Sequence, residues 1–265
     1  MTSRAPRLLW LPAALAAGLL VLPVVALVVR ADWATLPDDV TSAAARQALA
    51  LSLGTSLLAT GFCLLLGVPL AVVLARASGW GADVLRALVT LPLVLPPTVG
   101  GIALLFLLGR RGLIGQSLDA WFGITIPFTT AAVVIAQTFV AMPFLVLGLE
   151  GALRTSGTRY EAVAATLGAG RWTVLRRVTL PLAAPGLVSG TVLCFARALG
   201  EFGATALFAG NTPGVTRTMP LAIYSAFNGS GVSQGTAVAL SLLLVVAAAA
   251  VLLAARAWRP GRAGG

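Results

Sequence analysis

The stretch EGALRTSGTRYEAVAATLGAGRWTVLRRVTLPL, residues 150–182, joins two long apolar runs of the chain. Apolar residues recur in it at the spacing i, i+3, i+4 and i+7: Tyr160, Val163, Ala164 and Leu167. This spacing places them on one face of a short helix. Gly168 then breaks the pattern, as glycine does at helix ends, and Arg171 begins a second short helix that leads to Leu180 and Pro181. The stretch therefore predicts a helix–turn–helix with one apolar ridge.

Polar residues occupy the other faces of the first predicted helix. These residues are Arg159, Glu161 and Thr166. Such a basic amphipathic segment has two interpretations that periodicity alone leaves open. It could lie in the headgroup region with its arginines on anionic lipid. Alternatively, it could insert its ridge into a groove on a partner protein.

Apolar runs dominate the rest of the chain. Of its 265 residues, 58% are hydrophobic and 10% are charged, whereas a soluble domain carries about 25% charged residues. A helix needs about 20 apolar residues to cross the hydrocarbon core. Six segments meet or approach that length: Leu8–Val29, Leu49–Ala75, Leu88–Leu108, Thr129–Leu149, Leu182–Leu207 and Gly235–Ala255. We predict an all-α integral membrane protein with about six transmembrane helices.

The basic residues predict the orientation of these helices. All 18 are arginine, the formal charge is +10, and they gather at the ends of apolar runs and not on an aromatic-interleaved stripe. If six crossings leave both termini in the cytoplasm, twelve arginines lie inside, five lie outside, and Arg197 lies within the membrane. This asymmetry follows the positive-inside rule. We expect cytoplasmic N and C termini and no nucleic-acid partner.

The first apolar segment follows Arg4 and Arg7 and could therefore be a signal peptide. Its apolar stretch exceeds the roughly 7–15 residues of a signal core, so we expect a retained helix. Near residue 47 a single helix with a polar loop gives way to five closely spaced helices. We expect three parts: an N-terminal helix and outer loop (1–47), the main transmembrane domain (48–256) and a short cytoplasmic tail (257–265).

Composition argues against an enzyme. The chain has no histidine, and its two cysteines, Cys63 and Cys194, fall inside apolar runs while most acidic residues fall in loops. A catalytic site or metal centre needs a nucleophile and base, or a cluster of ligands. We therefore expect no catalytic residue and no metal site. Because the chain has no lysine, it cannot form a P-loop, whose lysine reaches the nucleotide phosphates.

The third apolar segment contains LPLVLPPTVGG, residues 91–101, in which Pro96 and Pro97 precede Gly100. Proline removes a backbone donor and breaks helices. Broken backbone at membrane depth is tolerated only where it is buried in protein or lines a cavity. The segment is therefore either a kink packed against its neighbours or a discontinuity that lines a pathway.

The fifth apolar segment contains FARALGEFGATALFAGN, residues 195–211. Arg197 and Glu201 are four residues apart, so on a helix they share a face and can pair. Ionisable side chains inside a membrane are costly and usually face the bundle interior. The pair is either a structural lock or an element of a gate. Gly203 would let another backbone approach closely.

The 150–182 stretch resembles the cytoplasmic loop signature of ABC-transporter permeases. That signature has a glycine, an aliphatic residue ten positions later and then Leu-Pro, which here are Gly168, Val178 and Leu180–Pro181. The family's glutamate lies six positions before the glycine, whereas Glu161 lies seven before it. The resemblance implies a loop that couples to an ATPase subunit. Its residues here would be Tyr160, Glu161, Ala164, Leu167, Gly168, Arg171, Leu180 and Pro181.

Further stretches extend the likeness over about residues 48–255: LPLVLPP, GRRGLIG, FGITIPF, TLGAGRW, LPLAAPGLVSGTVL, FARALGEFGAT and GVTRTMPLAIY. Together they resemble the molybdate ABC-transporter permeases, to which sulfate and thiosulfate permeases are related. The resemblance implies a type I importer permease fold in a prokaryotic plasma (inner) membrane. It implies molybdate as cargo, with sulfate, thiosulfate or tungstate as alternatives. An ion-coupled secondary transporter is the less favoured alternative, because Glu201 is the only clear carboxylate in a predicted span.

The resemblance also implies partners. Two copies of the chain would surround the path, two ABC ATPase subunits would hold ATP and Mg, and an extracytoplasmic binding protein would deliver the oxyanion. The chain itself would hold no cofactor. Candidates for the pathway or gate are Pro96, Pro97, Gly100, Arg197, Glu201 and Gly203. Candidates for docking the binding protein are Asn211 and Arg217 in the outer loop.

Overall fold

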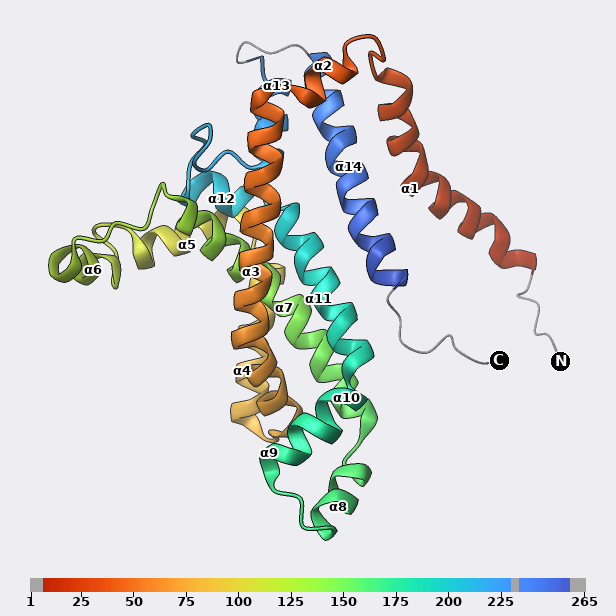
Figure 1. Cartoon of the computed structure of the whole chain (residues 1–265), viewed down its shortest axis with the longest axis vertical. Helices are drawn as coiled ribbons and strands as arrows, with labels where there is room; N and C mark the ends of the chain where they lie inside the picture. Colours follow the sequence, from red (N-terminus) through yellow and green to blue (C-terminus); the bar gives the residue numbers. More distant parts are fainter. Residues whose placement is uncertain (1–6, 230–233, 258–265) are drawn as a thin grey trace.

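The computed structural model describes residues 7–229 and 234–257, and in these residues all regular structure is helical (Figure 1). Four helices are long and apolar enough to cross a membrane: α1 (Trp10–Arg30), α3 (Ala43–Arg76), α7 (Thr130–Ser156) and α14 (Gln234–Ala257). Two bent helix pairs raise the number of crossings to six if each pair is one span. The predicted all-α membrane fold is confirmed. From residue 258 on, the predicted tail lies outside the described residues.

The third predicted crossing consists of two helices. α4 (Trp80–Val94) and α5 (Pro97–Leu108) meet at an angle of 115°. The break falls at Leu95 and Pro96, because two successive prolines remove two backbone donors and disfavour a helical residue before them. The prediction of one segment over Leu88–Leu108 is therefore corrected: the helix begins at Trp80 and turns sharply before Pro97.

The fifth predicted crossing is also divided. α11 (Ala184–Leu199) ends before Gly200, and the chain resumes as α12 (Gly203–Phe208). Before α11, the elements α9 (Arg171–Val174), η2 (Leu175–Thr179) and α10 (Leu180–Leu182) form a segment bent by 71° against it. The prediction of one segment over Leu182–Leu207 is corrected, because glycine weakens a helix where the chain passes Gly200.

α7 forms the centre of the bundle and packs against α3 and α11. Three clusters of buried apolar residues follow α7 from one end to the other. Small residues set the spacing: a Cβ on Gly148 would lie 3.3 Å from the Cα of Gly190, and a Cβ on Gly186 would overlap that of Ala152. Such contacts hold helices together in lipid, where apolar surface alone provides no driving force between them.

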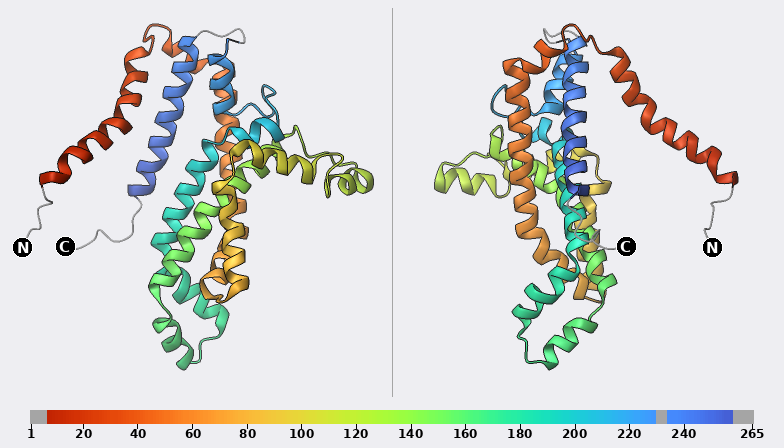
Figure 2. Two further views of the ribbon diagram at one scale, coloured as in Figure 1. Left: turned by 180° about the vertical axis from the view of Figure 1, so that it is seen from behind. Right: turned by 45° about the vertical axis from the view of Figure 1, so that its right-hand side comes forward.

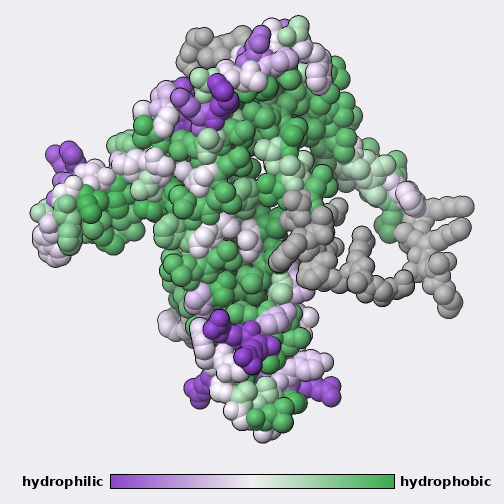
Figure 3. Space-filling model, viewed as in Figure 1, coloured by the Kyte–Doolittle hydropathy of each residue, from purple (hydrophilic) through white to green (hydrophobic). Residues whose placement is uncertain are grey.

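α1 stands apart from the bundle. None of its apolar stretch is buried, and it approaches α14 near the upper end of the molecule in Figures 1 and 2. The short α2 (Leu36–Thr41) follows it, and the hydroxyl of Thr236 on α14 donates to Asp39 Oδ1 at 2.7 Å. Residue 47, the predicted domain boundary, lies inside α3. Polar residues gather at the upper and lower ends of the molecule, with apolar surface between them (Figure 3).

Candidate functional site

The apolar ridge predicted within residues 150–182 lies on α8 (Arg159–Thr166) and the residue that follows it. α8 hangs below the bundle in Figure 1 and packs on α9 and η2. Tyr160, Val163 and Leu167 are 59%, 54% and 83% exposed, whereas Ala164 is half-buried. An exposed apolar ridge on a short helix is the feature that helix-in-groove recognition uses.

Gly168 ends α8 in a left-handed conformation. Its φ is +84°, its N–H donates to the carbonyl of Ala165 at 3.0 Å, and the N–H of Ala169 donates to the carbonyl of Ala164 at 3.1 Å. These two hydrogen bonds form a Schellman motif, which favours glycine at this position because glycine has no Cβ. Gly168 therefore sets the direction in which the chain leaves the ridge.

The second half of the stretch turns back towards the membrane helices. α9 begins at Arg171, and the guanidinium carbon of Arg176 lies 5.9 Å from the centre of the exposed Trp172 ring. The following turn, η2, is π-helical. This form is rare in proteins overall, and where it occurs it is often at a functional site. Leu180 and Pro181 begin α10, where a proline needs no intrahelical donor.

Glu161 connects α8 to the bundle. Arg76 Nη2, in the last turn of α3, donates to Glu161 Oε1 and Oε2 at 3.0 and 3.1 Å. The Thr179 hydroxyl, in η2, donates to Glu161 Oε1 at 2.6 Å. The Glu161 side chain is 19% exposed and that of Arg76 is 51% exposed. Glu161, which lies one position earlier than the glutamate of the family signature, thus has its polar partners within this chain.

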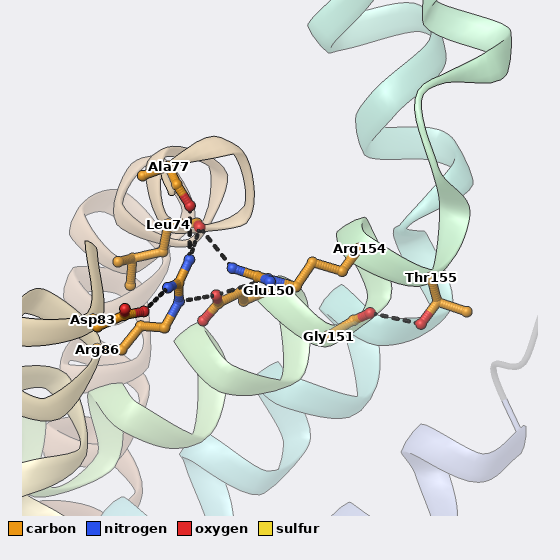
Figure 4. A network of polar contacts seen from close by, with 8 residues as sticks. All are labelled: Leu74, Ala77, Asp83, Arg86, Glu150, Gly151, Arg154 and Thr155. Atoms are coloured by element: carbon orange, nitrogen blue, oxygen red, sulfur yellow. Dashed lines mark hydrogen bonds and ion pairs between the residues drawn. The ribbon is translucent and has the colours of Figure 1, made fainter. Parts of the chain in front are cut away.

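A second ionic cluster, which sequence reasoning missed, lies where α3, α4 and α7 meet (Figure 4). Glu150 Oε1 accepts from the Nε atoms of Arg86 and Arg154 at 2.8 and 3.0 Å. Arg86 Nη2 also donates to the carbonyls of Leu74 and Ala77 at 2.8 and 2.9 Å. These carbonyls at the end of α3 would otherwise lack a helical hydrogen-bond donor. The four-residue spacing of Glu150 and Arg154 is a sequence signal, but only the fold brings Arg86 to them.

The two helix breaks lie against each other. A Cβ on Gly203 would lie 2.7 Å from the Cβ of Pro97, and a Cβ on Gly101 would lie 2.8 Å from the backbone oxygen of Ala204. α5 and α12 therefore touch along their backbones immediately after both breaks. Among the predicted pathway residues, Pro97 and Gly203 are thus in direct contact.

Pro96 and Pro97 begin α5. Pro96 takes the N-cap position with an extended backbone, and Pro97 is the first helical residue, where a missing donor is harmless. Gly100 lies one turn further and is buried against α7, because a Cβ there would lie 3.1 Å from the ring of Phe139. The prolines thus produce a discontinuity whose new helix packs on both α7 and α12.

Arg197 and Glu201 form an ion pair at the end of α11. Arg197 Nη2 lies 2.7 Å from Glu201 Oε2, and the side chains are 27% and 1% exposed. Glu201 follows the helix end, in the break, where its Oε1 accepts from the backbone N–H of Ala204 at 2.8 Å. The carboxylate therefore both neutralises Arg197 and caps the start of α12. The spacing of four predicted the pairing, but not the second role.

A buried amide on α7 is a pathway candidate that sequence reasoning missed. Gln137 is fully buried, and neither its Oε1 nor its Nε2 has a hydrogen-bond partner among the described residues. Ala136 and Val140 pack in the cluster that includes α12, whereas Val134 and Ala141 pack in the cluster that includes α11. Gln137 therefore lies on the side of α7 that packs against α11 and α12. A lone glutamine in an apolar run has no periodic signal by which to find it.

The two outer-loop candidates contact each other. Arg217 Nε donates to Asn211 Oδ1 at 2.8 Å, and Asn211 Nδ2 donates to Ser225 Oγ at 2.8 Å. The neighbouring Tyr224, on α13 (Met219–Phe227), lies with its ring centre 5.0 Å from that of Phe202. This polar cluster lies towards the end of the molecule opposite to α8 (Figure 1).

Comparison with known sequences gives consistent matches. The family described as "Binding-protein-dependent transport system inner membrane component" matches residues 67–261. The chain is 55% identical over 255 residues to the molybdenum transport system permease protein ModB of Mycobacterium tuberculosis (strain ATCC 25618 / H37Rv), which covers 96% of this chain and 95% of that protein. It is 47% identical over 191 residues to ModB of Escherichia coli (strain K12), with coverages of 72% and 83%.

Two solved structures show the same fold. The MetNI methionine ABC transporter in inward-facing conformations matches with a TM-score of 0.60 and 20% identity, over 79% of this chain and 91% of that chain. A bacterial alginate ABC transporter, in complex with an alginate pentasaccharide-bound periplasmic protein, matches with a TM-score of 0.73 and 17% identity, over 93% and 92%. At these identities the likeness establishes the fold alone.

Proposed function

Because this chain belongs to the family of binding-protein-dependent transport system inner membrane components, we propose that it is the membrane-spanning permease of an ATP-driven molybdate importer. The observation that supports molybdate as the cargo is the 55% identity to the molybdenum permease of M. tuberculosis across 96% of this chain. Molybdate and sulfate share charge and tetrahedral shape. The choice between them therefore rests on this relationship and not on the geometry of the site.

ATP would be bound and hydrolysed by a partner ATPase. The sequence has no lysine and therefore no P-loop. In this proposal two ATPase subunits hold ATP and Mg, and two copies of the permease surround the path. The chain contributes the moving membrane helices and no catalytic residue.

The ridge on α8 would dock in a groove of the ATPase. Its three exposed apolar side chains, Tyr160, Val163 and Leu167, support this role, because an apolar helix face gains most when a groove removes it from water. Closure of the ATPase subunits is a rigid-body motion, and it needs a stiff element to reach the membrane. In this proposal the ends of α3 and α7, the start of α1 and the end of α14 would lie on the cytoplasmic side.

The path would pass the junction of the α4–α5 and α11–α12 breaks. Broken helices are tolerated at membrane depth where they line a cavity or are packed in protein. The ion pair of Glu201 and Arg197 would close this junction, and the buried amide of Gln137 would add a polar group to it. The cluster of Asn211 and Arg217 at the opposite end would receive the binding protein that delivers the oxyanion.

Uptake of labelled molybdate into proteoliposomes tests the proposal. The vesicles would contain this chain with its ATPase, and the binding protein would be added outside, with and without ATP and excess sulfate. We expect ATP-dependent uptake that excess sulfate barely reduces. Efficient competition by sulfate would assign a sulfate-type importer instead. An intact complex that takes up neither ion would contradict the proposed cargo.

Gly168→Val is expected to uncouple ATP hydrolysis from uptake. A β-branched residue in the left-handed region costs about 1–2 kcal/mol of backbone strain. The Schellman turn would therefore open, and the orientation of the apolar ridge on α8 would change. We expect molybdate uptake per ATP hydrolysed to fall about tenfold, which corresponds to about 1.4 kcal/mol, while the amount of permease in the membrane stays the same. Parallel measurements of uptake and phosphate release give this ratio.

Gly170→Val is the matched control in the same turn. Gly170 has a φ of −66°, which valine can adopt, and a Cβ there would meet nothing within 4 Å. We expect its uptake per ATP to equal that of the unmodified chain. Normal coupling in Gly168→Val, or equal loss in both variants, would contradict the role given to the left-handed glycine.

A further inference from the structure

α8 is attached to the rest of the chain through two glycine joints. Gly157 follows α7 with a φ of +64°, and Gly168 follows α8 with a φ of +84°. A Cβ at either position would meet nothing within 4 Å, so no side chain packs against these joints, and backbone hydrogen bonds such as the Schellman pair at Gly168 hold them. Glycine is also the residue with the greatest backbone freedom. A helix between two such joints needs a further contact with the bundle before it can transmit a movement to the membrane helices.

A pocket separates α8 from the membrane helices above it. The pocket has a volume of about 320 Å³ and lies between α8 and the ends of α3 and α7. Its lining includes Arg76, Arg154, Thr158, Glu161 and Thr179. Apolar packing across this gap is therefore small, and α8 rests chiefly on α9 and η2.

One polar bridge crosses this pocket. Glu161 reaches from α8 to Arg76 on α3 at 3.0 Å, and to Thr179 on η2 at 2.6 Å. Arg76 Nη2 also lies 3.5 Å from the Thr179 hydroxyl, which closes a triangle. Three elements that are far apart in the sequence are thereby joined at one carboxylate, 85 residues from one partner and 18 from the other.

We propose that Glu161, Arg76 and Thr179 form a clasp that makes α8 a rigid lever on α3, so that Glu161 acts within this chain and not as a contact to the ATPase. The three are positioning residues, and their role in transport rests on the proposed function. α3 extends over 34 residues to the opposite end of the bundle, where Ser52 Oγ accepts from the backbone N–H of Met219 at 2.6 Å. The clasp thus connects the α8 ridge to the outer loop that contains Arg217.

Charge reversal tests the clasp in the assembled complex with its ATPase and binding protein. Glu161→Arg and Arg76→Glu would each place like charges together. Each is expected to lower uptake per ATP by about fivefold, which matches the free energy that a partly exposed ion pair contributes. The double variant restores opposite charges and is expected to return to within about twofold of the unmodified complex. A double variant as impaired as Glu161→Arg would overturn the proposal, because a contact from Glu161 to the ATPase predicts that result.

Arg177 provides a matched control for the rescue. It lies in the same loop, is exposed, and has no ion pair in the part of the chain that the structure describes. Glu161→Arg combined with Arg177→Glu restores the same net charge without restoring the pair, and is expected to stay impaired. Equal rescue by Arg177→Glu would show a general charge effect and would overturn the clasp.

Hydrogen exchange separates the clasp from the assignment of cargo. Amides of residues 159–166 in the complex without ATP are expected to exchange about fivefold faster in each single variant and at the original rate in the double variant. This readout does not depend on molybdate. Unchanged exchange in both single variants would overturn the clasp, whereas failure of the unmodified complex to take up molybdate would overturn only the proposed cargo.

Discussion

Gly101→Leu is expected to remove most of the uptake, by about tenfold or more, because overpacking of a tight contact costs about 1–3 kcal/mol or more. A Cβ at this position would lie 2.8 Å from the backbone oxygen of Ala204 and 3.1 Å from the Cβ of Leu207. The nearest atoms belong largely to the backbone of α12, which cannot move aside as a flexible side chain does. α5 and α12 would have to separate, and the junction of the two breaks would open.

The measurement is uptake at equal amounts of assembled complex, together with the thermal stability of that complex. Gly61→Leu is the matched control: this glycine also lies within a long apolar helix, and a Cβ there would meet nothing within 4 Å. We expect the control to retain uptake and stability. Full activity of Gly101→Leu would show that α5 and α12 do not form the close contact during transport.

Glu201→Leu is expected to destabilise the permease by about 3–5 kcal/mol, because it leaves a largely buried arginine without its partner. The carboxylate is 1% exposed and forms the 2.7 Å pair with Arg197. The same substitution removes the acceptor for the backbone N–H of Ala204. We expect little folded complex and no measurable uptake. Glu201→Gln retains an amide oxygen for Ala204, so its loss of stability is expected to be smaller.

A double variant separates a structural pair from a gate. Arg197→Leu combined with Glu201→Leu removes both charges, and replacing a buried ion pair by apolar residues is often neutral for stability. If the double variant folds but does not transport, the pair has a role in the path. If it both folds and transports, the pair is a lock that apolar packing can replace. Thermal unfolding of the purified complex and molybdate uptake give the two answers.

The candidate site was only partly predictable from the sequence. The ridge of α8, the turn at Gly168 and the start of α5 at Pro97 depend on local rules, since periodicity, a positive φ and a missing backbone donor all act within one or two turns. The four-residue spacing likewise brought Arg197 and Glu201 together. No sequence pattern pointed to Arg76, Arg86 or Gln137, because the two arginines pair with residues from distant segments and the glutamine has no spacing partner.

Sequence patterns alone predicted an all-α membrane protein, one span interrupted at Pro96–Pro97 and an amphipathic loop with an apolar ridge. Run length, arginine distribution and the Pro96–Pro97 pair suffice for this, because helices satisfy their backbone groups locally and lipid permits few other structures. Three features appear only in the folded molecule: the 115° bend, the contact between the two breaks and the Glu161–Arg76 pair. These depend on how helices far apart in sequence pack, and no local propensity specifies which distant side chain will lie across a pocket.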